Sequence, residues 1–137
     1  MKEQYLNYKK DYDKYILLIK NGNFYISLNN DAYIMNKLFN YKILESTNII
    51  KTGFPITNID KIKNELINKE INYLIIDNNI IDKYKSKNNN YDKYLSTNYK
   101  IYLNRINNIN KILKDNLNKD LNNVLFEIES ILCKINY

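Results

Sequence analysis

The first half of the chain alternates between short continuous apolar runs and stretches in which apolar residues recur at helical spacing. A continuous run with polar boundaries is typical of a strand that is covered on both faces. Asn21-Gly22 follows the first run, and both residues tolerate the positive φ that a type I′ hairpin turn requires. Short strands are therefore expected over residues 15–19, 23–28, 41–44, 48–51 and 71–76.

Helices are expected between these strands. Asn29 or Asn30 can cap a helix whose first turn holds Asp31, and Thr57 can cap another with Asp60 in the capping-box position. The expected helical segments are residues 2–13, 31–39 and 58–67. This order of elements predicts an α/β domain in which a small mixed β-sheet is flanked by helices.

The chain changes character near Asn78. Residues 83–91 are polar and are expected to form a loop, and two amphipathic helices with a break at 115–119 are expected after it. Their apolar stripes consist of Ile101 or Tyr102, Ile106, Ile109 and Leu113, and of Leu121, Val124, Leu125, Ile128, Leu132 and Ile135. We therefore expect an α/β domain over 1–82, and over 83–137 a loop and a C-terminal helical hairpin that packs on this domain or on a partner.

Four motifs in the first half occur in a recognisable order: Lys20-Asn21-Gly22-Asn23-Phe24-Tyr25-Ile26, Asn30-Asp31-Ala32, Gly53-Phe54-Pro55 and Tyr73-Leu74-Ile75-Ile76. Their order and spacing resemble the N-terminal domain of the MutS family of DNA mismatch-repair proteins. That domain has a buried strand, a Gly-Asp-Phe-Tyr-Glu segment, an Asp-Ala helix, a Gly-Val-Pro turn and a second buried strand. The resemblance covers residues 5–77, a little more than half of the chain.

The resemblance implies contact with DNA. In the family, the Phe of the motif stacks on the mispaired base and the Glu two residues later hydrogen-bonds to it. Phe24 matches the stacking residue, whereas Ile26 stands in place of the Glu and Asn23 in place of the Asp. An aromatic ring stacks on any base, but reading a base needs a polar group, so family-type mismatch recognition is not expected here. The candidate DNA-binding residues are Lys20, Asn23, Phe24, Tyr25 and Lys51, with Lys100 as a further phosphate contact.

Phe24 has an alternative interpretation as a core residue. Side chains alternate along a strand, so Phe24, Ile26 and Leu28 share one face, which is wholly apolar. The C-terminal hairpin could cover this face, because its own stripes need a partner.

The amino-acid composition limits the classes of function that we expect for this chain. The chain has a net charge of +6, which favours nucleic acid only weakly because Ile, Asn, Lys and Tyr all have AT-rich codons. It has no histidine, no phosphate-binding loop and no carboxylate cluster, so neither an enzyme nor a metal or other cofactor is expected. The single cysteine, Cys133, fits a cytoplasmic protein, and no run is long enough to span a membrane.

Three functions remain. The first is a non-catalytic nucleic-acid-binding protein that keeps the family's contact with DNA. The second is a protein-interaction module, an adaptor or an inhibitor of a nucleic-acid enzyme from a phage or mobile element, which would use the apolar face and some of the 14 tyrosines. The third makes the C-terminal helices a homodimerisation hairpin.

Overall fold

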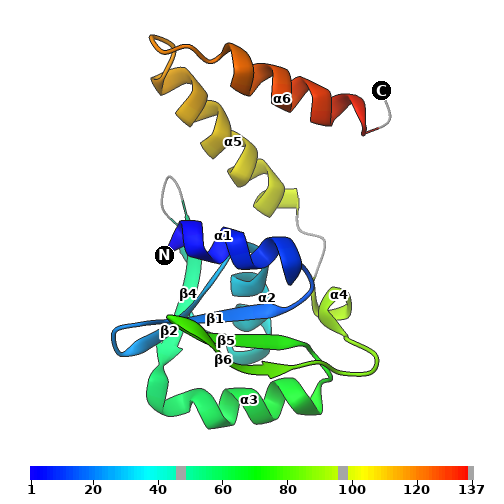
Figure 1. Ribbon diagram of the computed structural model, residues 1–137. Coiled ribbons are helices and arrows are strands. Elements are labelled where there is room, and N and C mark those ends of the chain that lie inside the picture. Colours follow the sequence, from blue (N-terminus) through cyan, green and yellow to red (C-terminus); the bar gives the residue numbers. More distant parts are fainter. Residues whose placement is uncertain (46–48, 96–98, 136–137) are drawn as a thin grey trace. The chain divides into compact units, whose positions relative to one another are not determined.

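The computed structural model describes residues 1–45, 49–95 and 99–135. The chain forms two units, Met1–Asn98 and Tyr99–Tyr137. The first unit contains α1 (Lys2–Asp11), β1 (Ile16–Asn21), β2 (Phe24–Leu28), α2 (Asn29–Phe39), β3 (Leu44–Glu45), β4 (Ile50–Pro55), η1 (Ile56–Asn58), α3 (Ile59–Asn68), β5 (Tyr73–Asp77), β6 (Asn79–Tyr84) and α4 (Tyr91–Tyr94). The second contains α5 (Tyr99–Asp115) and α6 (Asn122–Cys133) (Figure 1).

The strands described form one sheet of six, in the order β3-β4-β2-β1-β5-β6. β1 runs parallel to β5, and the other neighbours are antiparallel. The prediction of a small mixed sheet flanked by helices is therefore confirmed. The expected strand 48–51 is displaced: β4 extends from Ile50 through Gly53-Phe54-Pro55, which the resemblance places in a turn, and residues 46–48 lie outside the described residues.

The edge strand β6 is not predicted by the sequence pattern, and its last two residues fall within the expected loop over 83–91. Asn78 adopts a left-handed conformation (φ 64°) between β5 and β6, so the chain reverses there and pairs back along β5. Because β6 lies at the sheet edge and is largely exposed, it lacks the apolar run that marks β1 and β5. The first unit consequently extends past Asp82 and includes α4.

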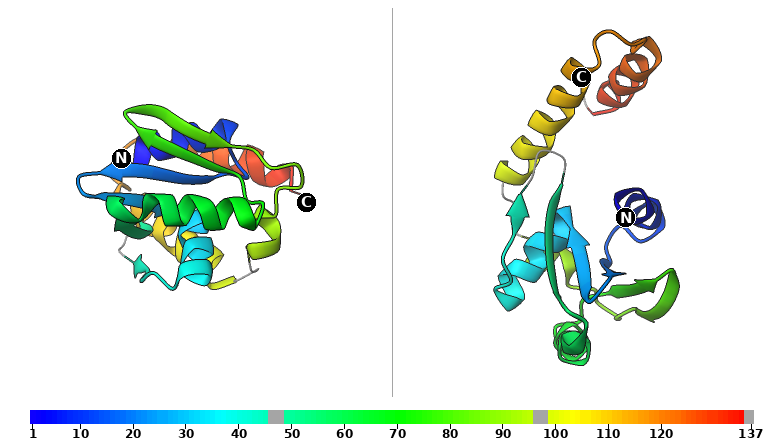
Figure 2. Two further views of the ribbon diagram at one scale, coloured as in Figure 1. Left: turned by 90° about the horizontal axis from the view of Figure 1, so that it is seen from below. Right: turned by 90° about the vertical axis from the view of Figure 1, so that its left-hand side faces the viewer.

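The sheet separates two apolar cores. Figure 1 shows α1 on one side and α3 on the other, and the right-hand view of Figure 2 shows α1 opposite α2. The core below α1 contains Tyr5, Leu17, Ile19, Leu28, Leu74 and Ile76. The larger core on the other face contains Ile16, Leu18, Tyr25, Ile34, Met35, Phe54, Ile62, Leu66, Ile71, Tyr73, Ile75 and Tyr91.

Asp31 joins the elements around β1. It is fully buried at the start of α2 and accepts hydrogen bonds from the hydroxyl of Tyr5, from Lys9 Nζ (2.9 Å), from the amide of Leu17 (3.1 Å) and from the hydroxyl of Tyr91 (2.5 Å). A buried carboxylate costs little when it has a cationic partner and several donors. Asp31 therefore connects α1, β1, α2 and α4.

Local turn chemistry differs from expectation at two places. The hairpin register pairs Asn21 with Phe24, so Gly22 and Asn23 form the turn, and of these only Gly22 has a positive φ (62°). The type I′ prediction is therefore wrong, because that turn needs positive φ at both positions. Neither α2 nor α3 has a side-chain cap, contrary to the predictions for Asn29, Asn30 and Thr57.

The helices α5 and α6 lie where the two apolar stripes predict them, and the chain between them overlaps the expected break at 115–119. None of the described side chains from residue 102 to residue 135 is buried. The predicted contributions of Lys100 and Ile101 lie outside the described side chains. No helix in the described ranges is both long enough and apolar enough to cross a membrane.

Candidate functional site

The side chains of β2 differ in burial along one face of the sheet. Phe24, Ile26 and Leu28 lie on the α1 side, as their alternation predicts. Leu28 is 1% exposed in the core below α1, Ile26 is only partly buried at the edge of that core, and Phe24 is 49% exposed near the hairpin turn. Within the first unit, the core below α1 therefore does not include Phe24.

A groove of about 440 Å³ lies beside Phe24. Its lining residues come from β1, β2, β4, β3 and the segment before β3: Asn21, Phe24, Ile26, Lys42, Leu44, Lys51, Thr52 and Gly53. We call it the Phe24 groove. Its volume is in the range of sites that hold small organic groups, and its apolar floor is formed by Phe24, Ile26 and Leu44.

The register between β2 and β4 places the residues that line the groove on one face of the sheet. Leu28 pairs with Lys51 and Ile26 with Gly53, so these β4 residues lie on the same face as Phe24. A Cβ on Gly53 would lie 3.0 Å from the Tyr25 carbonyl oxygen, so the absence of a side chain permits close approach of the strands and leaves the floor open above Gly53.

Two lysines border the apolar floor. The Thr52 hydroxyl, on the buried side of β4, donates a hydrogen bond to the Lys42 carbonyl oxygen (2.8 Å) and fixes the segment that carries Lys42 and Leu44. Within the described residues, neither Lys42 nor Lys51 takes part in an ion pair. The groove thus combines an exposed aromatic ring with two ammonium groups that form no ion pair with a carboxylate of the described residues.

The remaining predicted site residues lie elsewhere. Tyr25 is 7% exposed and packs in the opposite core, with its ring centroid 5.8 Å from that of Phe54. Lys20 pairs with Tyr25 across the hairpin, so it also lies on that opposite face, where its Nζ is 3.4 Å from Asp77. Asn23 is exposed in the turn, and its carbonyl oxygen accepts a hydrogen bond from the amide of Ile56 (2.9 Å).

Lys42 and Leu44 were not among the predicted site residues. In sequence they look like part of an ordinary short strand, and only the pairing of Leu44 with Lys51 brings them to the groove. The short strand expected over 41–44 does not say which strand lies next to β2.

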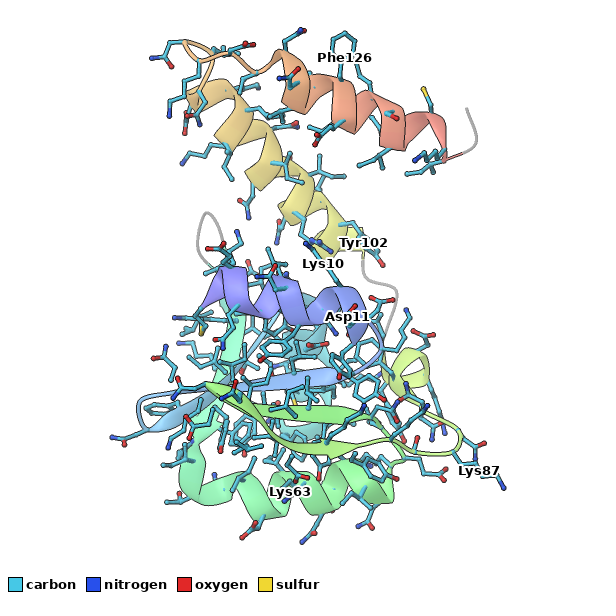
Figure 3. The ribbon with its side chains drawn as sticks, viewed as in Figure 1. Lys10, Asp11, Lys63, Lys87, Tyr102 and Phe126 are labelled. Atoms are coloured by element: carbon cyan, nitrogen blue, oxygen red, sulfur yellow. The ribbon has the colours of Figure 1, made fainter. Side chains whose placement is uncertain are left out.

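The carboxylates flanking β6 have structural partners. Asp82 accepts from Lys63 (2.6 Å), which projects from α3 (Figure 3), and from the Tyr73 hydroxyl (3.2 Å). Burial alone would raise the pKa of the Asp82 carboxyl, but these hydrogen bonds and the Lys63 charge lower it below its usual value. The described residues contain no group of three or more His, Cys, Asp or Glu side chains placed to hold a metal ion.

Comparison with known protein families identifies the family to which this chain is similar. The sequence model of the family described as MutS domain I matches residues 1–92, about two thirds of the chain. No sequence among the curated proteins matches the chain. The matched range contains the whole sheet and the Phe24 groove and ends within α4.

Proposed function

The chain belongs to the MutS domain I family, a family of non-catalytic DNA-binding domains that recognise mismatches, and from this premise we propose that it binds nucleic acid through the Phe24 groove. In the proposal, Phe24 stacks on an unpaired or unstacked base, and Lys42 and Lys51 contact the neighbouring phosphates. Asn23, exposed in the turn, lies on the approach to Phe24. The protein itself carries out no catalysis.

The observation that carries the proposal is the exposure of Phe24 in a groove whose lining also includes two lysines, Lys42 and Lys51. An aromatic ring that is left half-exposed while its strand neighbours are buried gains little for the fold. Base stacking on such a ring contributes about 1–3 kcal/mol per base and tolerates any sequence. Unpaired lysines beside it supply the salt-dependent attraction to phosphate.

Ile26 sets the expected selectivity. It lines the groove at the position where the family has a glutamate, and its side chain offers no hydrogen-bond donor or acceptor. Discrimination between bases depends on polar contacts with base edges. We therefore propose that the protein binds distorted or single-stranded DNA without the mismatch selectivity of its family.

The test is fluorescence anisotropy with labelled single-stranded, duplex and mispaired DNA at about 50 and about 200 mM salt. We expect binding that weakens steeply with salt. Phe24→Ala should reduce affinity by about 5- to 150-fold, because one stacking contact is lost. Lys42→Gln and Lys51→Gln should each lower the salt slope by about 1.

Matched controls lie outside the groove. Ile81 is 58% exposed on β6, so Ile81→Ala removes an exposed apolar side chain without touching the groove. Lys87 is exposed after β6 (Figure 3), and Lys87→Gln controls for the loss of one charge. Absence of binding to every probe at low salt, or equal losses in the Phe24 and Ile81 variants, would contradict the proposal.

A second candidate function is a protein-interaction module, an adaptor or an inhibitor of a nucleic-acid enzyme encoded by a phage or mobile element. The observation that favours it is the set of exposed apolar residues on α5 and α6. It predicts a partner whose binding is lost on substitution in these helices and is unaffected by Phe24→Ala.

A further inference from the structure

The apolar stripes of α5 and α6 have the spacing of helix-bundle seams. In α5 the seam residues are Tyr102, Ile106, Ile109 and Leu113, and in α6 with its flanking residues they are Leu121, Leu125, Ile128, Leu132 and Ile135. Steps of four and three residues alternate in both sets. This repeat averages 3.5 residues and is the pattern of helices that pack side by side with interlocking side chains.

Both seams are exposed. Ile106 is 53% exposed, Ile109 52% and Ile135 65%, and further exposed apolar residues flank the seams: Leu103, Ile112, Val124 and Ile131. With these flanks, the apolar arc of each helix is wider than the seam that a single neighbouring helix would bury. Each arc is therefore wide enough to pack against two helical neighbours, and the described side chains of both arcs are left exposed.

We propose that the α5–α6 hairpins of two copies of this chain pair to form a four-helix bundle. In such a dimer each helix contacts its own hairpin partner and a helix of the second copy, which closes both apolar arcs. The inference does not depend on the ligand of the Phe24 groove.

The charge distribution supports a second copy as the partner. The α5 segment has four basic residues and one acidic residue, whereas the α6 segment has two glutamates and no basic residue. Arg105 immediately precedes seam residue Ile106, and Glu129 immediately follows seam residue Ile128, so both lie beside the seams. A symmetric pair brings α5 of one copy against α6 of the other, so the basic helix meets the acidic helix twice.

The available surface is large enough for a stable dimer. With Phe126 left out, the apolar side chains exposed along the seams and their flanks amount to on the order of 1,000 Å², which is comparable with the ~800 Å² per partner of a standard interface. The described residues of the α/β unit form no comparable exposed apolar face, because α1 covers one side of the sheet and α2, α3 and α4 contribute to covering the other. Its exposed Phe24 groove has a floor of only three apolar side chains.

A dimer has a consequence for the proposed function. Two Phe24 grooves on one particle would bind one DNA molecule at two places, so that the second contact forms at high effective concentration. This consequence rests on the proposed function, whereas the dimer itself can be tested without DNA.

The test is the mass of the full chain in DNA-free solution, by sedimentation equilibrium over a dilution series. We expect twice the chain mass of 16.5 kDa at high concentration, with a dissociation constant on the order of 10 µM or tighter. Ile109→Asp and Leu132→Asp each place a charge in a seam and should weaken the dimer by at least about 10-fold. Circular dichroism should show that the helical content of the whole chain is retained.

Phe126 provides the matched control. It is 63% exposed but falls outside the seam spacing, and Figure 3 shows its side chain extending outward from the α6 ribbon. Phe126→Asp should leave the mass unchanged. Glu129→Arg should weaken the dimer, and Arg105→Glu in the same chain should restore it. A monomeric wild type at all concentrations, or equal weakening by the Phe126 and Ile109 variants, would overturn the proposal, whatever the outcome of the DNA-binding assay.

Discussion

At the scale of single residues, one strand carries side chains with different roles on the same face. Leu28 is covered by α1, whereas Phe24, four residues earlier, is left half-exposed beside Lys51 and Gly53. Ile26 lies between them and adds apolar surface to the groove without any polar atom. Ile26 itself therefore offers no group that could hydrogen-bond to a base edge.

Ile26 carries a direct prediction. Wild-type protein should bind matched and mispaired duplexes with similar affinity, because the isoleucine at position 26 cannot hydrogen-bond to a base. Ile26→Glu should lower affinity for all DNA, because it adds a negative charge near phosphates, and should raise the ratio of mispaired to matched affinity by about 10-fold. Competition anisotropy measures both.

Ile26→Gln is the control for that experiment. It supplies hydrogen-bonding groups without charge, so it should raise the ratio less and spare the overall affinity. A wild-type protein that already prefers mispaired DNA strongly would contradict this account of Ile26.

At the scale of elements, Asp31 holds together segments that are far apart in sequence. Its carboxylate accepts from α1, β1 and α4 while it belongs to α2. Lys9, which donates to Asp31, also donates to the carbonyl oxygens of Asp13 and Tyr15 (2.8 and 2.7 Å), so the chain between α1 and β1 is fixed through the same cluster. The arrangement explains how a short helix such as α1 can be anchored to the sheet.

Removing this carboxylate should be strongly destabilising. Asp31→Ala removes the acceptor of the buried Tyr91 hydroxyl and the carboxylate that pairs with Lys9, and it leaves Tyr5 and Lys9 with carbonyl acceptors alone. We expect a loss of about 3–5 kcal/mol in the free energy of unfolding. Urea unfolding measures it. Asp92→Ala removes an acid whose partner, Lys14, lies 3.0 Å away on the surface, so it should change stability by no more than about 1 kcal/mol. Equal effects would contradict the assigned role of Asp31.

At the scale of the whole molecule, folding raises the pKa of tyrosines on several elements, among them Tyr5, Tyr73 and Tyr91. Burial, followed by the nearby Asp31 charge, raises the pKa of Tyr5 on α1 and of Tyr91 on α4 above the usual value of 10.0. Burial and the Asp82 charge raise the pKa of Tyr73 on β5. The folded state therefore binds these phenolic protons more tightly than the unfolded state does.

The sign of the resulting pH dependence follows from linkage. Stability from these groups is fully present below the unfolded pKa of about 10 and is lost as pH rises above it. In an absorbance titration of the 14 tyrosines, we expect an incomplete native curve that reaches full ionisation only when the fold is lost. In concentrated urea all tyrosines should ionise together near pH 10. Complete reversible ionisation near that pH in folded protein would contradict the buried placement of Tyr5 and Tyr91.

The amino-acid sequence by itself determined those features whose cause is local. The continuous apolar runs predicted β1 and β5, Gly22 predicted a reversal before β2, and the four-and-three spacing predicted α5 and α6. The alternation of side chains along β2 correctly predicted that Phe24, Ile26 and Leu28 share one face. Each of these follows from side-chain periodicity or from the conformational freedom of one residue.

Only the tertiary structure decided which part of that face is covered. Alternation says that Phe24 and Leu28 point the same way, but the position of α1 across the sheet buries one and exposes the other. In the same way, strand order and register bring Lys42 and Leu44 to the groove and put Lys20 on the opposite face. Strand neighbours are chosen by contacts between segments distant in sequence, so no local pattern encodes them.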